Sequence, residues 1–357
     1  MEKIVISWFQ EHQRDLPWRK TQDPYCIWVS EIMLQQTQVI RVIDYYERFL
    51  QQFPTIQLLA TAPQSQLLKA WEGLGYYSRV RNMQQAAQII MIEHHGVFPQ
   101  TYSEIIALPG IGTYTAGAIL ACAFQQAYPA VDGNVLRVMS RMQADFSDIS
   151  KPATKKMWEQ YLAELMTTEN PSAFNQGLIE IGALICTPTN PRCDQCPLHS
   201  QCQAVIHDYQ DELPIKASKK PAKIYYYETF LLTDGDRIAI IENRQKGVLQ
   251  HLWSLPQYQV ENHDENQADI TKIVKKNFHS TQEATYFGIY RHVFSHQIWW
   301  MRVWLVHVNV LPTPITGAFI NQVDFLDYPM ANSHRKIVKA FWGEIPLQVA
   351  EDIKKYK

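Results

Sequence analysis

A single glutamate, Glu31, stands in an otherwise almost wholly apolar stretch, Trp28-Val29-Ser30-Glu31-Ile32-Met33-Leu34. Asp23-Pro24 is a favourable helix start, as N-cap and first helical residue. Most single glutamates on helices face solvent, but apolar residues lie one turn before and one turn after this one, which predicts desolvation. Desolvation raises a carboxyl pKa, so Glu31 is a candidate general acid at neutral pH.

The end of the same helix carries Gln35, Gln36 and Thr37. Their amides and hydroxyl can fill the space that a displaced base leaves and can bond to its partner. This pattern is therefore compatible with a site that handles one base pair.

A second candidate carboxylate, Asp132, follows the segment Leu108-Pro109-Gly110-Ile111-Gly112 and a run of small residues. Gly110 and Gly112 can take positive φ and turn backbone N–H groups outward, beside a helix that starts near Thr113. The segment is either an ordinary Pro-Gly turn between core helices or a helix-hairpin-helix, near 108–124, that grips a DNA backbone. Asp132 begins the next helix, where a simple N-cap is the alternative to a chemical role.

Glycines on both sides of Leu74 predict a tight, exposed turn that presents Leu74 and Tyr76, with Arg79 and Arg81 behind them. This is either a loop with ordinary core aromatics or a wedge that enters a base stack. In the second case the arginines would bind phosphates.

Four of the six cysteines, Cys186, Cys193, Cys196 and Cys202, are separated by six, two and five residues. A zinc ribbon normally has two Cys-x-x-Cys pairs, and here there is one. The spacing alone favours a [4Fe–4S] cluster and leaves zinc as the alternative. Cys26 and Cys122 lie in apolar helical surroundings, which favours core packing over metal binding for both.

The elements that must position these residues change character along the chain. Residues 1–208 show helical spacing throughout, and 209–223 form a polar linker with two prolines. After the linker the period becomes two, with strands expected at 224–232, 237–241, 286–294 and 298–310. Helices are expected near 268–278 and 333–342. The second half is therefore α+β.

The formal net charge of −2 excludes a global positive field, so any DNA contact must come from local Lys and Arg. The N-terminus is no signal peptide, and the uncharged stretch 105–131 is interrupted by Gly, Pro and Gln. We expect a soluble, cytoplasmic protein that is a monomer.

Taken together, these features resemble the MutY family of adenine DNA glycosylases, in the helix-hairpin-helix, iron–sulfur glycosylase superfamily. The resemblance covers nearly the whole chain. It is carried by the cysteine set, whose 6-2-5 spacing is the superfamily's cluster spacing, and by these motifs: Leu16-Pro17-Trp18-Arg19, Ser30-Glu31-Ile32-Met33-Leu34-Gln35-Gln36-Thr37-Gln38, Gly73-Leu74-Gly75-Tyr76-Tyr77, Leu108-Pro109-Gly110-Ile111-Gly112, Val131-Asp132-Gly133-Asn134-Val135 and Phe294-Ser295-His296.

The resemblance implies an all-α helix-hairpin-helix glycosylase domain over 1–208, with a [4Fe–4S] cluster in the loop 186–202. After the linker 209–223, it implies an α+β Nudix-like domain over 224–357 that recognises the opposite base. The implied activity is removal of adenine mispaired with 8-oxoguanine or guanine in duplex DNA, after base flipping. In a bacterial cell such a protein would associate with the nucleoid through DNA.

By the same resemblance, Glu31 is the acid that protonates adenine and Asp132 stabilises the oxocarbenium sugar, as in a two-carboxylate glycosidase. The other implied site residues are Tyr114 and Asn134 beside this centre, Arg14, Trp18 and Glu180 around the adenine, Gln36, Thr37, Leu74 and Tyr76 beside the opposite base, and Gly110 and Gly112 on the DNA backbone.

Ser295 and His296 fall between two expected strands, at a hairpin tip where recognition residues often lie. A turn serine and a structural histidine are the alternative reading of the spacing. The family's Phe-Ser-His loop implies instead that Phe294, Ser295 and His296 read the opposite base.

The chain also departs from related patterns. Bifunctional relatives carry a lysine nucleophile where this chain has Tyr114, and some family members have a lysine where it has Leu136, so Schiff-base chemistry is not expected. The linker has no cysteine for the zinc site of some animal relatives. The helix near 269–278 is lysine-rich instead of carrying the glutamates of a Nudix box, so we expect no catalytic magnesium.

Two rival functions remain at this stage. One is a bifunctional pyrimidine glycosylase and AP lyase of the endonuclease III type, against which the residue at position 114 argues. The other is a non-catalytic iron–sulfur protein that binds DNA or transfers electrons, against which both carboxylates argue.

Overall fold

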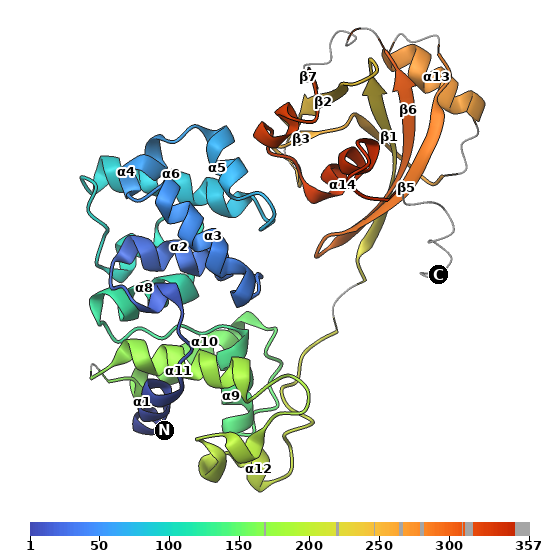
Figure 1. Ribbon diagram of the computed structural model, residues 1–357. Coiled ribbons are helices and arrows are strands. Elements are labelled where there is room, and N and C mark those ends of the chain that lie inside the picture. Colours follow the sequence, from blue (N-terminus) through green and yellow to red (C-terminus); the bar gives the residue numbers. More distant parts are fainter. Residues whose placement is uncertain are drawn as a thin grey trace. The chain divides into compact units, whose positions relative to one another are not determined.

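The computed structural model describes residues 1–357 except 168, 219–220, 246, 264–266, 279–281, 309, 311–316 and 347–357. The chain divides into two compact units, residues 1–62 with 78–219 and residues 63–77 with 220–357. The first unit is helical and the second is built around a sheet (Figure 1). This confirms the predicted pairing of an all-α with an α+β fold. Among the described residues, no helix is long and apolar enough to cross a membrane.

The first unit contains helices joined by short turns. They are α1 (Glu2–His12), η1 (Pro17–Arg19), α2 (Pro24–Leu34), α3 (Val39–Gln52), α4 (Ile56–Thr61), α6 (Ser78–Glu93), α7 (Tyr102–Ile106), α8 (Thr113–Phe124), α9 (Gly133–Met142), α10 (Pro152–Leu165), α11 (Pro171–Leu184), η2 (Cys193–Gln195), η3 (His199–Gln201) and α12 (Gln203–Ile206). Proline stands in the first turn of α2, α10 and α11, where its missing N–H has no helical partner to lose.

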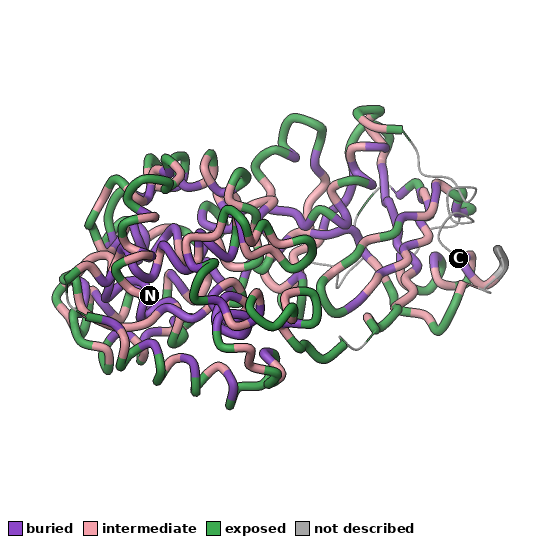
Figure 2. Tube along the Cα trace, turned by 90° about the horizontal axis from the view of Figure 1, so that it is seen from below, coloured by how far each residue is buried: buried purple, intermediate pink, exposed green. Residues whose placement is uncertain are grey.

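Small residues let the central helices approach closely. α2 packs against α3 and α8, and α11 packs against α1, α8 and α9. A Cβ added at Gly182 of α11 would lie 2.6 Å from Asn134 Cβ of α9, so this contact requires glycine. Buried positions run through the interior of the helical unit (Figure 2), and in α8 every residue from Thr115 to Ala121 is buried.

The second unit contains α5 (Gln64–Ala70) and a seven-stranded sheet with its own helices. These elements are β1 (Lys223–Thr233), β2 (Ile238–Glu242), β3 (Trp253–Ser254), β4 (Gln257–Val260), α13 (Gln267–Phe278), β5 (Thr285–Val293), β6 (Gln297–His307), β7 (Gly317–Ile320), η4 (Asp324–Asp327) and α14 (Asn332–Phe341). The main strand order is β3-β2-β1-β6-β5, with β4 paired to β1 and β7 paired to β2.

The parallel pair β1 and β6 forms the centre of the sheet and is in register from Lys223 with Gln297 to Thr233 with His307. Phe230 and Trp304 belong to a core with Val274 and Phe278 of α13, so α13 covers one sheet face. The predicted β5–β6 pairing is confirmed as antiparallel.

The predicted strands differ from the observed ones at one strand end and in three short strands. The second long strand ends at His307 and not at residue 310, and residue 309 lies outside the described residues. The short strands β3, β4 and β7 were not predicted, because two to four residues carry too little periodicity to detect.

Candidate active site

The middle of α2 carries Glu31 into a cavity of about 180 Å³ that Arg19, Tyr114 and Gln176 also line. Its Oε2 atom is buried and has no hydrogen-bond partner within the described part of the chain. Burial raises the pKa of Glu31 to about 7, although a hydrogen bond from Tyr114 opposes the shift. At neutral pH a substantial fraction of Glu31 is therefore protonated and able to act as an acid.

Tyr114, in the first turn of α8, is hydrogen-bonded to Glu31 and lies close enough to Asp132 to be affected by its charge. Burial raises its pKa well above the ordinary value, and the nearby charges of Glu31 and Asp132 act in the same direction. Tyr114 therefore stays a neutral phenol that donates a hydrogen bond.

Asp132 is the N-cap of α9. Its Oδ1 accepts from the backbone N–H of Asn134 at 2.8 Å and of Val135 at 2.9 Å, and its Oδ2 accepts from Asn134 Nδ2 at 2.7 Å. Burial nevertheless raises the pKa of Asp132, because desolvation outweighs these bonds. The structure confirms the predicted N-cap, and a chemical role for the same side chain stays a prediction.

Arg137 fixes the amide of Asn134, a contact that the sequence analysis missed. Its Nη2 donates to Asn134 Oδ1 at 2.8 Å and to the Gly182 carbonyl at 2.8 Å, and its Nε donates to the Cys186 carbonyl at 2.6 Å. The carboxylate of Asp132 is therefore connected to the start of the cysteine loop through two side chains. The sequence did contain a signal for the Arg137–Asn134 contact, because the arginine follows the asparagine by one helical turn.

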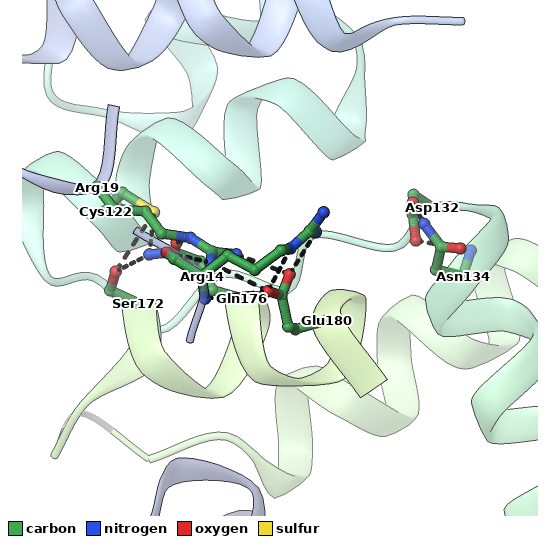
Figure 3. A network of polar contacts seen from close by, with 8 residues as sticks. All are labelled: Arg14, Arg19, Cys122, Asp132, Asn134, Ser172, Gln176 and Glu180. Carbon is green, nitrogen blue, oxygen red and sulfur yellow. Dashed lines mark hydrogen bonds and ion pairs between the residues drawn. The ribbon is translucent and has the colours of Figure 1, made fainter. Parts of the chain in front are cut away.

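Two arginines and one glutamate form the next part of the cavity wall. Arg14 and Arg19 each make two bonds to the Glu180 carboxylate, with shortest distances of 2.7 and 2.9 Å (Figure 3). Burial alone would raise the pKa of Glu180, but the two guanidinium groups lower it to about 2. One carboxylate thus faces two cations, which leaves the pocket locally positive. Trp18, on the buried side of η1, lines the same cavity.

A chain of hydrogen bonds along the cavity wall runs from Arg19 through Gln176 to Ser172 and Cys122. Arg19 Nε donates to Gln176 Oε1 at 2.9 Å, so the Gln176 amide nitrogen faces Ser172 at 2.9 Å and the Cys122 sulfur at 3.7 Å (Figure 3). The sequence analysis favoured core packing over metal binding for Cys122 and did not predict that it also lines the pocket. Its thiol lines the pocket, because α8 and α11 meet around the cavity at this point.

The turn between α7 and α8 has the expected helix-hairpin-helix form. Gly110 has φ of +81°, and a Cβ there would lie 2.8 Å from Asn82 Cβ. Gly112 does not take positive φ. It is the N-cap of α8 at φ −103° and leaves this helix start exposed.

Arg79 does not have the predicted phosphate-facing role. Its guanidinium is buried and donates to the carbonyl oxygens of Ile32 at 2.7 Å, Met33 at 3.0 Å and Gln35 at 2.6 Å. These are the orphan carbonyls at the end of α2, which need donors once the helix stops. Arg79 therefore fixes the helix end from which Gln36 and Thr37 project.

The turn around Leu74 is tight as predicted, with Gly73 at φ +99° and Gly75 at φ +73°. The sequence analysis predicted that this turn exposes both Leu74 and Tyr76, and only the prediction for Tyr76 is correct. Tyr76 is 41% exposed, whereas Leu74 is 7% exposed and packs inward.

The Phe294–His296 segment joins β5 to β6, with Ser295 and His296 exposed. Phe294 N–H donates to the Gln297 carbonyl at 2.8 Å, and the Phe294 ring packs on Trp299 at 4.8 Å between centroids. The Tyr76 hydroxyl is hydrogen-bonded to the Ser295 hydroxyl within the second unit. Two residues predicted for the opposite base thus lie together.

The four cysteines after α11 line one small cavity together with Arg141 and His199. None of the four is joined in a disulfide, and Arg141 donates to the Cys186 sulfur at 3.3 Å. Among the described residues, no three His, Cys, Asp or Glu side chains converge closely enough for one metal ion. Thiols arranged around a cavity suit a cluster, because each thiolate binds a different iron.

Comparison with known proteins identifies two matching families. Residues 29–166 match the HhH-GPD superfamily base excision DNA repair protein, and residues 228–340 match the NUDIX domain. The adenine DNA glycosylase of Buchnera aphidicola subsp. Baizongia pistaciae is 35% identical over 85% of this chain and 85% of that protein. The human adenine DNA glycosylase is 31% identical over 96% of this chain and 74% of that protein.

Among solved structures, a thermostable thymine-DNA glycosylase matches 57% of this chain and 94% of its own, at 26% identity and a TM-score of 0.53. An endonuclease III in a DNA complex is 22% identical with a TM-score of 0.50, which supports the fold alone. The longer matches, which extend over both units, are with adenine DNA glycosylases. The chain therefore belongs to the adenine DNA glycosylases, the N-glycosylases of base excision DNA repair.

Proposed function

We propose that this enzyme removes adenine opposite 8-oxoguanine or guanine by protonating the flipped base and stabilising a cationic sugar. The observation that carries the mechanism is the pKa of Glu31, which is about 7. Glu31 shares its cavity with Tyr114, and the negative charge of Asp132 contributes to raising its pKa. The cavity of about 180 Å³ is smaller than the roughly 300–1,000 Å³ of drug-sized ligand sites. It suits one nucleobase.

In this mechanism Glu31 donates its proton to a ring nitrogen of adenine as the bond to the sugar breaks. The bonding electrons leave with the base, and the positive charge moves to the sugar. Asp132 then stabilises that cation, and its low-dielectric setting makes the attraction stronger than it would be in water. The ionised Glu31 takes a proton from water as the hydroxyl adds to the sugar.

We propose that the enzyme is monofunctional. Position 114 carries a phenol whose pKa is raised and that offers no amine for a Schiff base. Strand breaks should therefore appear only after alkali or heat, and borohydride should trap little covalent DNA adduct.

The experiment is a single-turnover assay on a duplex with one adenine opposite 8-oxoguanine, developed with alkali on a gel. Asp132→Asn should bind the mismatch but lose nearly all cleavage, and Glu31→Gln should also be nearly inactive. The exposed changes Glu47→Gln and Asp211→Asn are matched controls that should keep the parental rate. Parental rates in either site variant would refute the assignment.

We propose that the opposite base is read by the second unit. 8-Oxoguanine differs from guanine by an N7–H donor and an O8 acceptor, and a serine can bond to either group. Ser295 is exposed at the strand junction and meets Tyr76, which supports a shared surface for that base. Gln36, at φ +55° beyond the end of α2, supplies an exposed amide for the stack.

We propose that Cys186, Cys193, Cys196 and Cys202 hold a [4Fe–4S] cluster, which would supply structural cross-linking of the loop. Their arrangement around one cavity supports this assignment. Purified protein should contain iron and be brown. Cys196→Ser should lower iron content, solubility and DNA binding, whereas the control Cys26→Ser should keep all three. Stoichiometric zinc without iron in native protein would contradict the proposal.

A further inference from the structure

The segment that follows α12, residues 209–217, is polar in composition but is bound to the helical unit along its length. Its backbone is held at three points: the Leu213 carbonyl by Arg141 Nε at 2.8 Å, the Ile215 carbonyl by Ile149 N–H at 3.0 Å, and the Ala217 N–H by Asp148 Oδ1 at 3.3 Å. The Leu213 side chain is 2% exposed and belongs to the same core as Cys202. We call residues 209–217 the docked segment, because its backbone groups are paired with the helical unit as in a folded element.

The docked segment also forms part of the wall of the cysteine cavity. Gln210 lines that cavity together with the four cysteines. Its Oε1 atom is buried and has no hydrogen-bond partner within the described part of the chain. An amide carries an acceptor on one side and two donors on the other, and a thiolate sulfur accepts from such donors. Gln210 is therefore placed where a half-turn of its amide would bond to the ligands of an occupant.

Arg141 connects the docked segment to the cysteine loop. Its guanidinium is 2% exposed and donates from Nη1 to the Cys186 sulfur at 3.3 Å and to the Thr187 carbonyl at 2.8 Å, while Nε holds the Leu213 carbonyl. Among the residues that the structure describes, no carboxylate pairs with Arg141. A buried cation without an anion is costly. Metal-bound cysteines are thiolates, so a loaded cavity supplies negative charge to the guanidinium that also binds the docked segment.

We propose that the docked segment is part of the cluster site and that the segment and the cluster stabilise each other. The loaded cysteines hold the segment through Arg141, and the segment covers the cavity through Gln210. This inference rests on the [4Fe–4S] assignment proposed above, and it involves no residue of the adenine cavity.

The coupling is reciprocal, because a group that binds only the closed form of a site stabilises that form. Loss of the cluster therefore releases the docked segment and lengthens the free chain that leads to β1. Release of the segment, in turn, exposes the cysteine cavity and speeds the loss of iron. Each direction can be measured without an excision assay.

The first experiment measures tryptic cleavage after Lys216 in the full-length protein by mass spectrometry. Lys216 lies between Ile215 and Ala217, whose backbone groups are both bonded to the helical unit, so cleavage there requires local opening. Cleavage should be slow in the iron-loaded protein and at least tenfold faster after bathophenanthroline has removed the iron. Lys156, which is exposed on α10, reports general unfolding and should be cut at an unchanged rate.

The second experiment measures the rate at which iron is released to bathophenanthroline. Leu213→Ala removes a buried anchor of the docked segment and should speed both iron release and cleavage after Lys216 at least fivefold. Ile215→Ala, at a 39% exposed position of the same segment, is the matched control. Gln210→Leu should speed iron release at least threefold, and Gln201→Leu, exposed in the cysteine loop, is its control.

Iron analysis of the unmodified protein separates the two proposals. Native protein without iron would overturn the cluster assignment and this inference together. In an iron-loaded protein, this inference alone is overturned if chelation leaves cleavage after Lys216 unchanged or speeds cleavage after Lys156 equally. It is also overturned if Leu213→Ala and Gln210→Leu, at parental melting temperatures, release iron at the parental rate.

Discussion

Replacing Tyr114 with phenylalanine should move the pH dependence of adenine excision to higher pH. The proposed acid is protonated Glu31, so the single-turnover rate constant should be level below the pKa of about 7 and fall tenfold per pH unit above it. Tyr114 donates a hydrogen bond that lowers the pKa of Glu31. Without that donor, the carboxylate is less stabilised and holds its proton to higher pH.

The size of the shift follows from the bond that is lost. A hydrogen bond to a charged group contributes about 1.5–3 kcal/mol, and one pKa unit corresponds to about 1.4 kcal/mol. The descending limb should therefore move up by about one to two pH units. The height of the plateau can change for other reasons, because Tyr114 also lies beside Asp132, so the position of the limb is the quantity to measure.

Asp132→Asn should shift the pH dependence of excision in the opposite direction, to lower pH. The negative charge of Asp132 raises the pKa of Glu31, and a neutral amide removes that contribution. Its residual activity should therefore fall off at lower pH than in the parent.

The assay is single-turnover excision from a duplex with adenine opposite 8-oxoguanine, measured from pH 5 to pH 10 with enzyme in excess. A limb that stays in place in Tyr114→Phe, or that moves to lower pH, would refute Glu31 as the titrating acid. Separately measured DNA binding at each pH ensures that the limb reports the chemical step.

Three other changes should give distinct readouts. Glu31→Gln should stabilise the protein at pH 8 by up to about 3 kcal/mol but little at pH 4, in equilibrium denaturation. The reason is that the folded pKa of Glu31, about 7, exceeds its ordinary value of 4.5, so the stability that the carboxyl provides at low pH is lost as pH rises through 7. Gly182→Ala should lower the excision rate at least tenfold with a smaller effect on DNA binding, because the new Cβ would lie 2.6 Å from Asn134 Cβ. A parental excision rate would contradict this prediction and show that α11 can move away from Asn134 without loss of activity. Ser295→Ala with His296→Ala should narrow the preference for adenine opposite 8-oxoguanine over guanine several-fold, in competition between the two duplexes, and unchanged discrimination would exclude this tip as the reader.

The sequence was most informative where a residue's environment is set by its close neighbours along the chain. The apolar neighbours of Glu31 were enough to predict its desolvation, and Asp132 could be predicted as an N-cap from its place before Gly133 and Asn134. The two-residue period was enough to predict that β5 pairs with β6. These features depend on neighbours within a few positions along the chain.

Contacts between distant segments could not be predicted in the same way. Arg79 is one of two arginines after a glycine turn, and nothing local shows that its guanidinium reaches back to the carbonyl oxygens of Ile32 and Gln35. Cys122 sits in an apolar helix, yet the approach of α11 turns its thiol into a cavity wall. Both outcomes depend on how helices pack, which the pattern within each helix does not contain.

The hydrogen bonds around Asn134 have a fixed polarity. Arg137 can only donate, so it holds the amide oxygen of Asn134 and turns the amide nitrogen toward the acceptor Asp132. An asparagine at position 132 could still cap the helix, but its own NH2 would then face the NH2 of Asn134. Rotating Asn134 by half a turn would relieve that clash and create another against Arg137. The orientation of the Asn134 amide is therefore set at both ends, by Asp132 and by Arg137. A substitution at position 132 alters the hydrogen bond of Arg137, although the two side chains are not in contact through their own polar atoms.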